Sequence, residues 1–234
     1  MSVPRIVNPR EAPVIGTDAH LPPVSADALS VAALRERFAR GAGWQPEFHG
    51  DGRVFTDRSP AEAAVLVALV EREDGLRVLL TRRSEHLRAH AGQISFPGGR
   101  VEPEDGDAAV TALRETQEEV GLPQARVQVI GRMPTYTTVT SYVVTPVVGL
   151  VQAPFELSEL VLDTFEVAEA FEVPLVFLMD PANHRRHVFD FDGLQRHFLS
   201  MPWHGTATDG SQREYFIWGA TAAMLRNLYR FLST

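Results

Sequence analysis

The chain of 234 residues contains no cysteine, which excludes disulfides, thiolate metal sites and a cysteine nucleophile. No apolar run approaches the roughly 20 residues of a membrane-spanning helix. Met1 to Pro13 has no apolar core, so we expect no secretory signal peptide there. These absences favour a globular protein of a reducing compartment. We therefore expect a cytoplasmic location and no membrane partner.

The chain has fewer positively than negatively charged residues, with 22 Lys and Arg and 30 Asp and Glu, so its net charge is −8. A broad nucleic-acid surface needs clustered cations, so we expect no nucleic-acid partner. A local basic patch nevertheless exists, formed by Arg82, Arg83 and Arg88 with His86 and His90. The patch suits a small anionic ligand rather than a polyanion.

The sequence predicts two parts. Residues 1–53 form an N-terminal arm and helix: residues 1–25 hold five prolines and read as an extended arm with few internal contacts. A helix is expected over 26–40, followed by a glycine-rich segment that Trp44 and Phe48 anchor. Residues 54–234 form the main domain, which includes a C-terminal helix.

Within the main domain, strands and helices alternate. Strands are expected at 63–70, 77–82, 126–133 and 143–151, a helix at 107–120, a strand or loop at 166–173, a short helix at 174–179, a hairpin of 187–191 with 195–200, and a terminal helix at 214–232. This order predicts an α/β (α+β) fold, in which helices cover both faces of a mixed sheet.

Three glutamates are concentrated in the central helix. Glu115 is spaced i,i+3 from Glu118 and i,i+4 from Glu119, so all three project from one side of the helix. Such like charges repel each other, and a divalent ion, which prefers hard oxygen ligands, would remove the repulsion. The alternative is an ordinary solvated helix face.

The surroundings of these glutamates favour a functional site. Upstream, Phe96-Pro97-Gly98-Gly99 predicts a tight turn that is neither a regular helix nor the centre of a strand. Downstream, Gly121 suits the C′ position of the helix, and Pro123 stops it. A glycine turn thus precedes a capped helix that carries acids on one side.

This arrangement resembles the Nudix box, G-x5-E-x7-R-E-U-x-E-E-x-G-U, where U is aliphatic. The second half matches from Arg114 to Leu122, except that Thr116 replaces an aliphatic residue. The first half is one residue too long, and Asp105 falls on the acid position when the glycine is set at Gly99. The resemblance implies the Nudix α/β/α sandwich with its mixed β-sheet.

A second pattern resembles the coenzyme A pyrophosphatase branch of the Nudix hydrolases. Leu79-Leu80-Thr81-Arg82-Arg83-Ser84 is followed by Arg88, Gly92 and Phe96-Pro97-Gly98-Gly99, which matches L-L-T-x-R-[SA]-x3-R-x3-G-x3-F-P-G-G. The resemblance implies cleavage of the pyrophosphate of coenzyme A or acyl-CoA. The products would be adenosine 3′,5′-bisphosphate and 4′-phosphopantetheine or its acylated form.

By the same resemblance, Mg²⁺ or Mn²⁺ would be the cofactor. Glu118 and Glu119 would hold the ion most directly, and Glu115 would be a further ligand or the water-activating base. The carbonyl of Gly98 would be another ligand, and Gly99 would lie against the substrate.

Two further sets of residues are candidates for this site. Members of the family often recruit a distant acid, and Glu166, Glu169 and Glu172 are available, with Glu166 or Glu169 as a metal ligand or base. Residues three apart on a strand point opposite ways, so at most one of Glu166 and Glu169 should reach the site unless the strand bulges. The alternative is a solvated edge strand. Arg83 and Arg88 could grip phosphates bidentately, or could merely tether their loop.

Other functions stay open. The chain could hydrolyse another nucleoside-diphosphate compound, such as ADP-ribose or NADH, or be a catalytically silent ligand-binding module. His184, His187, His197 and His204 read as strand residues rather than zinc ligands, and Trp203, Tyr215 and Trp218 as core residues. The partner is expected to be a small molecule, and a homodimer is not excluded.

Overall fold

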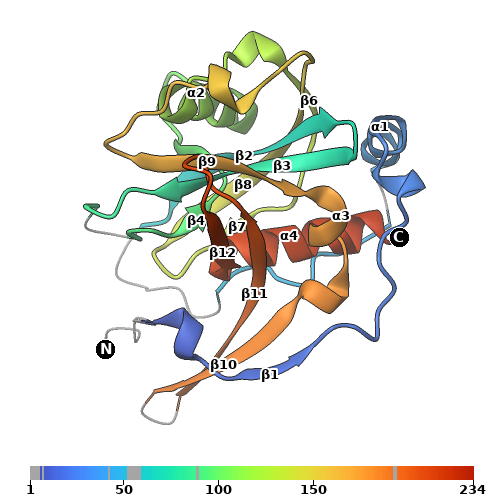
Figure 1. Ribbon diagram of the computed structural model, residues 1–234, viewed down its shortest axis with the longest axis vertical. Coiled ribbons are helices and arrows are strands. Elements are labelled where there is room, and N and C mark those ends of the chain that lie inside the picture. The colour runs from blue at the N-terminus through green and yellow to red at the C-terminus, as the bar shows by residue number, and fades with distance from the viewer. Residues whose placement is uncertain (1–5, 7, 42, 52–58, 88–89, 192–193) are drawn as a thin grey trace.

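The computed structural model describes all residues except 1–5, 7, 42, 52–58, 88–89 and 192–193. The chain forms two β-sheets with helices packed between and outside them (Figure 1). The main sheet contains β2 (Ala61–Arg72), β3 (Gly75–Arg83), β4 (Ile94–Ser95), β5 (Gly98–Arg100), β6 (Val127–Arg132), β7 (Tyr136–Thr137), β8 (Tyr142–Val151) and β9 (Val167–Pro174). The second sheet contains β1 (Val14–Thr17), β10 (Arg185–Phe191), β11 (Leu194–Thr206) and β12 (Gln212–Trp218).

The helices are α1 (Val31–Arg40), α2 (Ala108–Val120), α3 (Leu175–Leu178) and α4 (Gly219–Leu232). Short 3₁₀ helices occur at Pro9–Glu11, Asp27–Leu29, Gln124–Arg126, Leu157–Glu159 and Pro181–Asn183. Over the part of the chain that the structure describes, no helix combines the length and apolarity needed to cross a membrane.

The main sheet is mixed and buried on both faces. Its order is β4-β3-β2-β8-β6, with β5 on β2, β7 on β8 and β9 on β3. The central strands β2 and β8 run parallel from the pair Ala61–Tyr142 to the pair Val70–Val151. Both read as nearly continuous apolar runs, as expected for strands that are covered on two sides.

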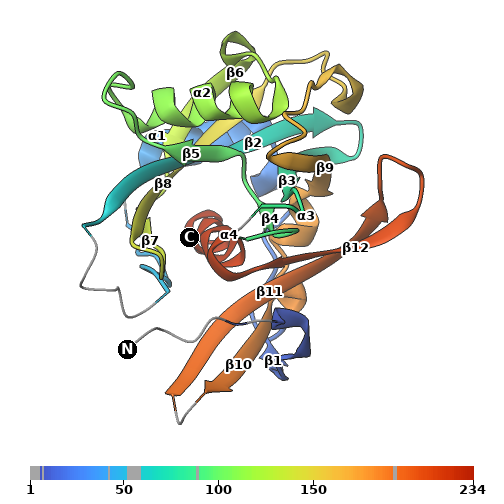
Figure 2. The same cartoon turned by 90° about the vertical axis from the view of Figure 1, so that its left-hand side faces the viewer.

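Alternate residues of β2 serve two separate cores. Leu66 faces the core beneath α2, whereas Val67 and Leu69 face the core that contains α4. Figure 2 shows α2 and α4 on opposite sides of the main sheet, with the second sheet beyond α4. The predicted α/β architecture, with helices on two faces of a mixed sheet, is confirmed.

The expected terminal helix at 214–232 is wrong in its first five residues. Glu214 to Trp218 belong to β12, and the helix begins at Gly219, whose φ of +63° breaks the strand. The run from Tyr215 to Trp218 is aromatic and β-branched, which suits a pleated surface better than a helix. This run pairs with β11, and local periodicity in the sequence cannot predict such a pairing.

The N-terminal arm makes more contacts than the sequence predicted. β1 pairs with β10 and extends the second sheet, and Val24 is buried in the core around α4. The expected helix at 26–40 is interrupted at Ser30, whose side chain caps α1 by accepting a hydrogen bond from Ala33 N. Trp44 and Phe48 pack against the same core, as expected.

A buried ion network joins this arm to the C-terminal helix. The Arg226 guanidinium, on α4, lies 3.2 Å from Asp18 Oδ2 and donates from Nε to Glu47 Oε2 at 2.7 Å. Arg186 of β10 donates to the same two carboxylates, at 2.7 and 2.8 Å. Arg226 also donates to His184 Nδ1 at 3.1 Å. The arm is thus fixed by charge as well as by apolar contact.

Candidate active site

The acidic helix α2 has well-defined ends. The Asp107 side chain accepts hydrogen bonds from Ala109 N at 2.7 Å and Val110 N at 3.1 Å, which caps the N-terminus. Gly121, with φ of +72°, closes the C-terminus by donating its N–H to Gln117 O. These caps fix the rotation of the helix, and with it the direction of its glutamates.

Thr116 fills the position where an aliphatic residue is usual. Its side chain is buried beneath the helix, and its hydroxyl donates to Ala112 O at 2.6 Å. A threonine is tolerated there because that bond satisfies the buried hydroxyl within the helix itself.

The glycine segment, expected to be a turn, enters strand β5 at Gly98 and lies directly against two of the three glutamates. Gly98 N donates to Glu119 Oε2 at 3.1 Å, and a Cβ on Gly99 would overlap the Glu115 carboxylate. β5 pairs with β2 opposite Ala64 and Val65, and this pairing holds the segment in place. Glycine is required at position 98, where φ is +149° and a Cβ would overlap the backbone of β2, and the structure brings Gly98, Gly99, Glu115 and Glu119 together.

The three glutamates differ in environment. Glu119 is only 6% exposed, Glu115 is half-buried, and Glu118 is exposed. Burial raises the pKa of Glu119 to about 7, although the Gly98 N–H and the Arg83 guanidinium oppose the rise. Burial also raises the pKa of Glu115, against the opposing charge of Arg114. Glu166 adds negative charge at both carboxylates, so it lies close to them.

Arg114 orients the carboxylates around it. Its Nη1 donates to Glu115 Oε1 and to Glu118 Oε2, both at 3.0 Å. Its Nε and Nη2 donate to the two oxygens of Asp105, at 2.8 and 2.9 Å. One guanidinium thus connects the acidic helix to the loop that follows β5.

Arg83 is the cation nearest to the buried glutamate. Its Nη1 lies 3.9 Å from Glu119 Oε1, and its backbone N–H donates to Gln93 O at 3.0 Å. The guanidinium is partly exposed, so it remains accessible to an anionic ligand. Arg88 lies outside the described residues, so its role in gripping phosphates stays a prediction.

Glu166 and Glu169 lie in different places. β9 pairs with β3 through an irregularity at Arg82 and Arg83, where Glu169 lies opposite Arg82 and Val167 lies opposite Arg83. Glu166, just before β9, is near enough to the glutamates of α2 to add negative charge at two of them. The carboxylate of Glu169 is instead buried on the other face of the sheet.

Glu169 has a complete set of partners on that face. Its carboxylate accepts from Arg82 Nε at 3.2 Å, Arg213 Nη1 at 2.7 Å, Tyr215 Oη at 2.8 Å and Thr208 N at 3.3 Å. The expectation that Glu169 could be a metal ligand or base is therefore corrected. Glu172 is likewise held away from the site, by two hydrogen bonds from Arg72.

The donor set suits a divalent cation. Glu115, Glu119 and Glu166 offer hard oxygens, and Glu119 is buried with no cation closer than Arg83 among the described residues. As they stand, Glu115 and Glu118 turn toward Arg114, and no three carboxylate or histidine side chains within the described ranges converge closely enough to hold an ion. Binding therefore requires these side chains to turn toward Glu119, while Gly98 and Gly99 leave the approach free of side chains.

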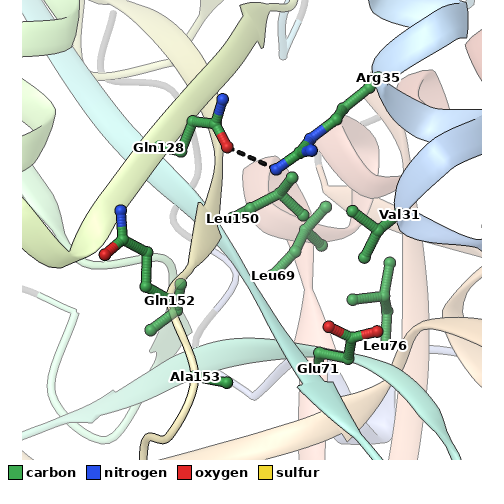
Figure 3. A pocket seen from close by; sticks show the side chains of 10 residues that line it. Val31, Arg35, Leu69, Glu71, Leu76, Gln128, Leu150, Gln152 and Ala153 are labelled. Carbon is green, nitrogen blue, oxygen red and sulfur yellow. Dashed lines mark hydrogen bonds between the residues drawn. The ribbon is translucent and has the colours of Figure 1, made fainter.

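The cavity shown in Figure 3 is separate from this site. It measures about 380 Å³ and lies at the far end of β2, seven residues beyond the pairing of Ala64 with Gly99. Leu69, Leu76 and Leu150 line it, and Arg35 of α1 donates to Gln128 across its rim at 2.5 Å. Nothing in its lining resembles the acidic centre.

Some residues beside the site were not predicted as functional. Asp163 N donates to Glu119 O at 2.9 Å, which docks the segment before β9 onto the end of α2. Phe165 and His86 form an exposed aromatic pair next to it. Of the aromatic residues expected in the core, Tyr215 is buried and Trp203 and Trp218 are partly buried. Sequence gives no signal for the exposure of Phe165, which depends on the packing of two distant segments.

The histidines follow the expectation only in part. His184 and His187 are buried and hydrogen-bonded within the protein, the latter to Ala12 O and Ser200 Oγ. His197 and His204 are exposed on β11. None belongs to a group of three possible metal ligands among the described residues.

A capped acidic helix packed on a glycine turn above a mixed sheet defines a hydrolase of the Nudix class. The family model of the NUDIX domain matches residues 60–191, and the chain belongs to the Nudix hydrolase family. It is 42% identical over 173 residues to the uncharacterized Nudix hydrolase NudL of Escherichia coli (strain K12), covering 71% of this chain and 80% of that relative. The protein of the same name from Shigella boydii serotype 18 is 41% identical over the same length and coverage.

Solved structures of the family show lower similarity. The Ap4A hydrolase of C. elegans, in a binary complex, is 22% identical with a TM-score of 0.41, covering 48% of this chain and 80% of that one. A MutT/nudix family protein from Enterococcus faecalis is 15% identical with a TM-score of 0.44, covering 88% and 75%.

Family membership makes this protein an enzyme, a hydrolase of nucleoside-diphosphate derivatives. Enzymes of this family generally use divalent metals, and their substrates are small molecules.

Proposed function

We propose that this enzyme cleaves the pyrophosphate of coenzyme A or acyl-CoA, with Mg²⁺ or Mn²⁺ as its cofactor. The products would be adenosine 3′,5′-bisphosphate and 4′-phosphopantetheine or its acylated form. The observation that carries the proposal is the joining of two motifs in space. Gly98 and Gly99, which end the branch signature, contact Glu119 and Glu115 of the acidic helix, and Arg83 of the same signature lies 3.9 Å from Glu119.

In this reaction each residue of the site would have a separate role. Glu118 and Glu119, with Glu115 and the carbonyl of Gly98, would hold the divalent ion, which supplies charge neutralisation and a more acidic water when bound. Arg83 would hold a phosphate oxygen, and Gly99 would let the substrate approach the backbone. Arg114 keeps Glu115 and Glu118 oriented from the opposite side.

The general base is open between two groups. Glu115 lies on the helix beside Gly99, and Glu166 lies on the facing segment. Either carboxylate could take the proton from the attacking water. Glu115→Gln and Glu166→Gln, assayed over a range of pH at saturating metal, separate them, because loss of the base removes the acidic limb of the rate profile.

The decisive experiment is a substrate panel with one matched pair of variants. Purified protein is incubated with coenzyme A, acetyl-CoA, ADP-ribose and NADH plus Mg²⁺ or Mn²⁺, and the products are identified by mass. We expect the highest kcat/KM for a coenzyme A substrate. All panel members carry a pyrophosphate, so discrimination must come from the 3′-phosphate and the pantetheine arm.

Within this panel, Glu119→Gln should lower kcat at least ~100-fold, which corresponds to about 2.7 kcal/mol of barrier. Glu104→Gln, an exposed acid of the preceding loop, is the matched control and should retain the wild-type rate. Equal efficiency on every substrate would defeat the coenzyme A assignment. A folded Glu119→Gln enzyme with full activity would defeat the metal-site assignment.

The absence of cysteine is compatible with the cytoplasm, where we propose that the enzyme acts. A monomer and a homodimer both remain open, and light scattering of the purified protein distinguishes them.

A further inference from the structure

Phe165 is an exposed aromatic ring beside the acidic site. Among the described residues, the large apolar side chains that are exposed are Val14, Ile15, Val110, Val161, Phe165 and Val176. Phe165 is the aromatic member of that set, and it is 66% exposed. Single exposed apolar residues are common and need no function. The inference therefore rests on where this ring lies and how it is held.

The backbone on both sides of Phe165 is fixed. Ser84 N donates to Glu166 O at 2.8 Å, and Ser84 Oγ donates to Thr164 O at 3.0 Å. Phe165 N itself donates to Asp163 Oδ1 at 2.9 Å. An exposed ring on such a tethered backbone is presented to solvent in a defined position, unlike a ring on a free loop tip.

The same hydrogen bonds tie the ring to the acidic centre. Asp163 N donates to Glu119 O, so a single residue, Thr164, separates Phe165 from a direct contact with α2. Glu166, the next residue, is near enough to add negative charge at Glu115 and Glu119. Ser84, which holds the segment, follows Arg83 directly. These bonds therefore tie the segment of Phe165 both to the end of α2 and to the strand end that carries Arg83.

A second ring completes the surface. His86 lies with its ring centroid 5.1 Å from that of Phe165, at an interplanar angle of 55°. The tilt is too large for a parallel stack, so the face of each ring is only partly covered by the other. His86 is exposed as well. The pair offers an apolar face and a polar edge to a flat ligand.

We infer that Phe165 and His86 form the subsite that receives the nucleobase of the substrate, and that Phe165 stacks on an adenine ring. This inference rests on the proposed function and extends it to a binding residue outside the acidic helix. A neutral base gains from stacking on an aromatic face, whereas the phosphates need Arg83 and the metal. The nucleoside and pyrophosphate would thus be recognised by adjacent segments that Ser84 holds together.

The kinetic test compares an aromatic side chain at position 165 with an apolar side chain that has no ring. Phe165→Leu keeps an apolar side chain but removes the ring, and Phe165→Trp keeps a ring. With coenzyme A, Phe165→Leu should raise KM at least about fivefold, since base stacking contributes at least about that factor, with kcat within about twofold of wild type. Phe165→Trp should keep a KM close to wild type.

Val161→Ala is the matched control. Val161 lies on the same segment and is 76% exposed, but it carries no ring. This variant should keep the wild-type KM. Melting temperatures of all variants establish that each is folded before kinetics are compared.

An equilibrium test does not depend on turnover. With EDTA present, AMP and ribose 5-phosphate are titrated into wild type and Phe165→Leu by calorimetry. Wild type should bind AMP at least about fivefold more tightly than ribose 5-phosphate, and the variant should lose that preference. This preference tests the base subsite even if the panel shows no coenzyme A hydrolysis, in which case the proposed function fails and the subsite stands.

Three results overturn the inference. One is an unchanged KM in Phe165→Leu. Another is a loss that grows with the acyl chain length of the substrate and is absent with free coenzyme A, which would place Phe165 against the thioester end. The third is a wild-type protein that binds AMP no better than ribose 5-phosphate, and an exposed pair occupied by a second copy of this chain would give that result.

Discussion

Asp105 accepts two hydrogen bonds from Arg114, from Nε at 2.8 Å and from Nη2 at 2.9 Å. These bonds, with another from Glu102 N, hold the pKa of the Asp105 carboxyl well below its usual range. Asp105 is the residue that the one-residue insertion left on the acid position of the Nudix box. The longer loop therefore still delivers a carboxylate to Arg114, whose remaining bonds orient Glu115 and Glu118.

Asp105→Asn should consequently weaken a site that Asp105 does not touch. Asparagine can pair with Arg114 through one oxygen only, so the guanidinium loses its fixed orientation. We expect activity or metal affinity to fall about 10–100-fold, which is typical for residues that support metal ligands. A metal titration of the rate measures it, and Glu104→Gln in the same loop is the control. If the rate at saturating metal and the metal dependence both stay at wild-type values, Arg114 does not need Asp105.

Because Glu119 is buried, we expect the stability of the metal-free protein to depend on pH in an unusual way. Burial raises the pKa of Glu119 to about 7 from an ordinary 4.5, so between these values the folded state binds more protons than the unfolded state. Its contribution to stability is thus full below about pH 4.5 and is lost as the pH rises through about 7. The loss amounts to roughly 3 kcal/mol at 1.36 kcal/mol per unit.

Glu119→Gln should remove this dependence. In EDTA at pH 8, we expect the variant to be more stable than wild type, and the difference should shrink toward pH 5. Denaturant unfolding at both values measures it, with the exposed Glu118→Gln as the control. Saturating Mg²⁺ should raise the Tm of wild type more than that of Glu119→Gln. A variant less stable than wild type at pH 8 would show that Glu119 is not strained in the metal-free state.

The parts of the fold with strong local signals could be predicted from sequence. The central helix was expected at 107–120 and spans Ala108–Val120, because Asp107 and Gly121 mark its two ends. The strand expected at 143–151 spans Tyr142–Val151, because its apolar run is nearly unbroken. The resemblance to the Nudix box also implied that Gly98 lies in one site with the glutamates, although the first half of the box is one residue longer here.

The remaining features depend on pairing between distant segments. β1 forms because β10 offers an edge more than 160 residues away, and β12 forms because β11 pairs with residues that could have started a helix. Strand alternation predicted that Glu166 and Glu169 would be separated, but it could not show which of them lies on the side of the acidic helix, because that depends on how β9 pairs with β3. The family model covers residues 60–191, so the proposed division at residue 53 remains a prediction for the arm.

The contacts of Arg226 indicate that the N-terminal arm has a structural role. Its side chain is buried and is shared between Asp18 of the arm, Glu47 and His184. Removing one partner from a buried ion network leaves charges uncompensated. Arg226→Met should therefore lower the free energy of unfolding by about 3 kcal/mol, because Arg186 continues to pair with both carboxylates.

Limited proteolysis should then cleave the arm of the Arg226→Met protein before the rest of the chain. Arg230→Met, one turn further along α4, is the control and should leave the cleavage pattern unchanged. Equal protease resistance of both variants would mean that apolar contacts such as Val24 hold the arm without this network.

We expect the contribution of His184 to the stability of the protein to be lost in mild acid. Its Nε2 donates to Leu178 O at 2.8 Å and its Nδ1 accepts from Arg226 at 3.1 Å, so a second proton would face a guanidinium. Burial, together with that cation, lowers the pKa of His184 to about 4 from an ordinary 6.5. The unfolded state therefore binds more protons between these values. The contribution of His184 is full above about pH 6.5 and is lost as the pH falls toward 4, by roughly 3 kcal/mol.

The measurement is the free energy of unfolding of wild type and His184→Gln between pH 7 and pH 5. The difference between the two proteins isolates His184, because Glu119 contributes equally to both. His187 has a pKa lowered by burial as well, whereas Glu119 contributes a slope of opposite sign in both metal-free proteins, so the prediction concerns the difference between wild type and variant rather than the slope of either protein. Burial raises the pKa values of Asp18 and Glu47, but the hydrogen bonds and charges of Arg186 and Arg226 together outweigh it and keep both below their ordinary range, outside this window. His204→Gln, on the exposed face of β11, should reproduce the wild-type pH profile, and a His184→Gln profile that runs parallel to that of wild type would show that His184 is not the group responsible.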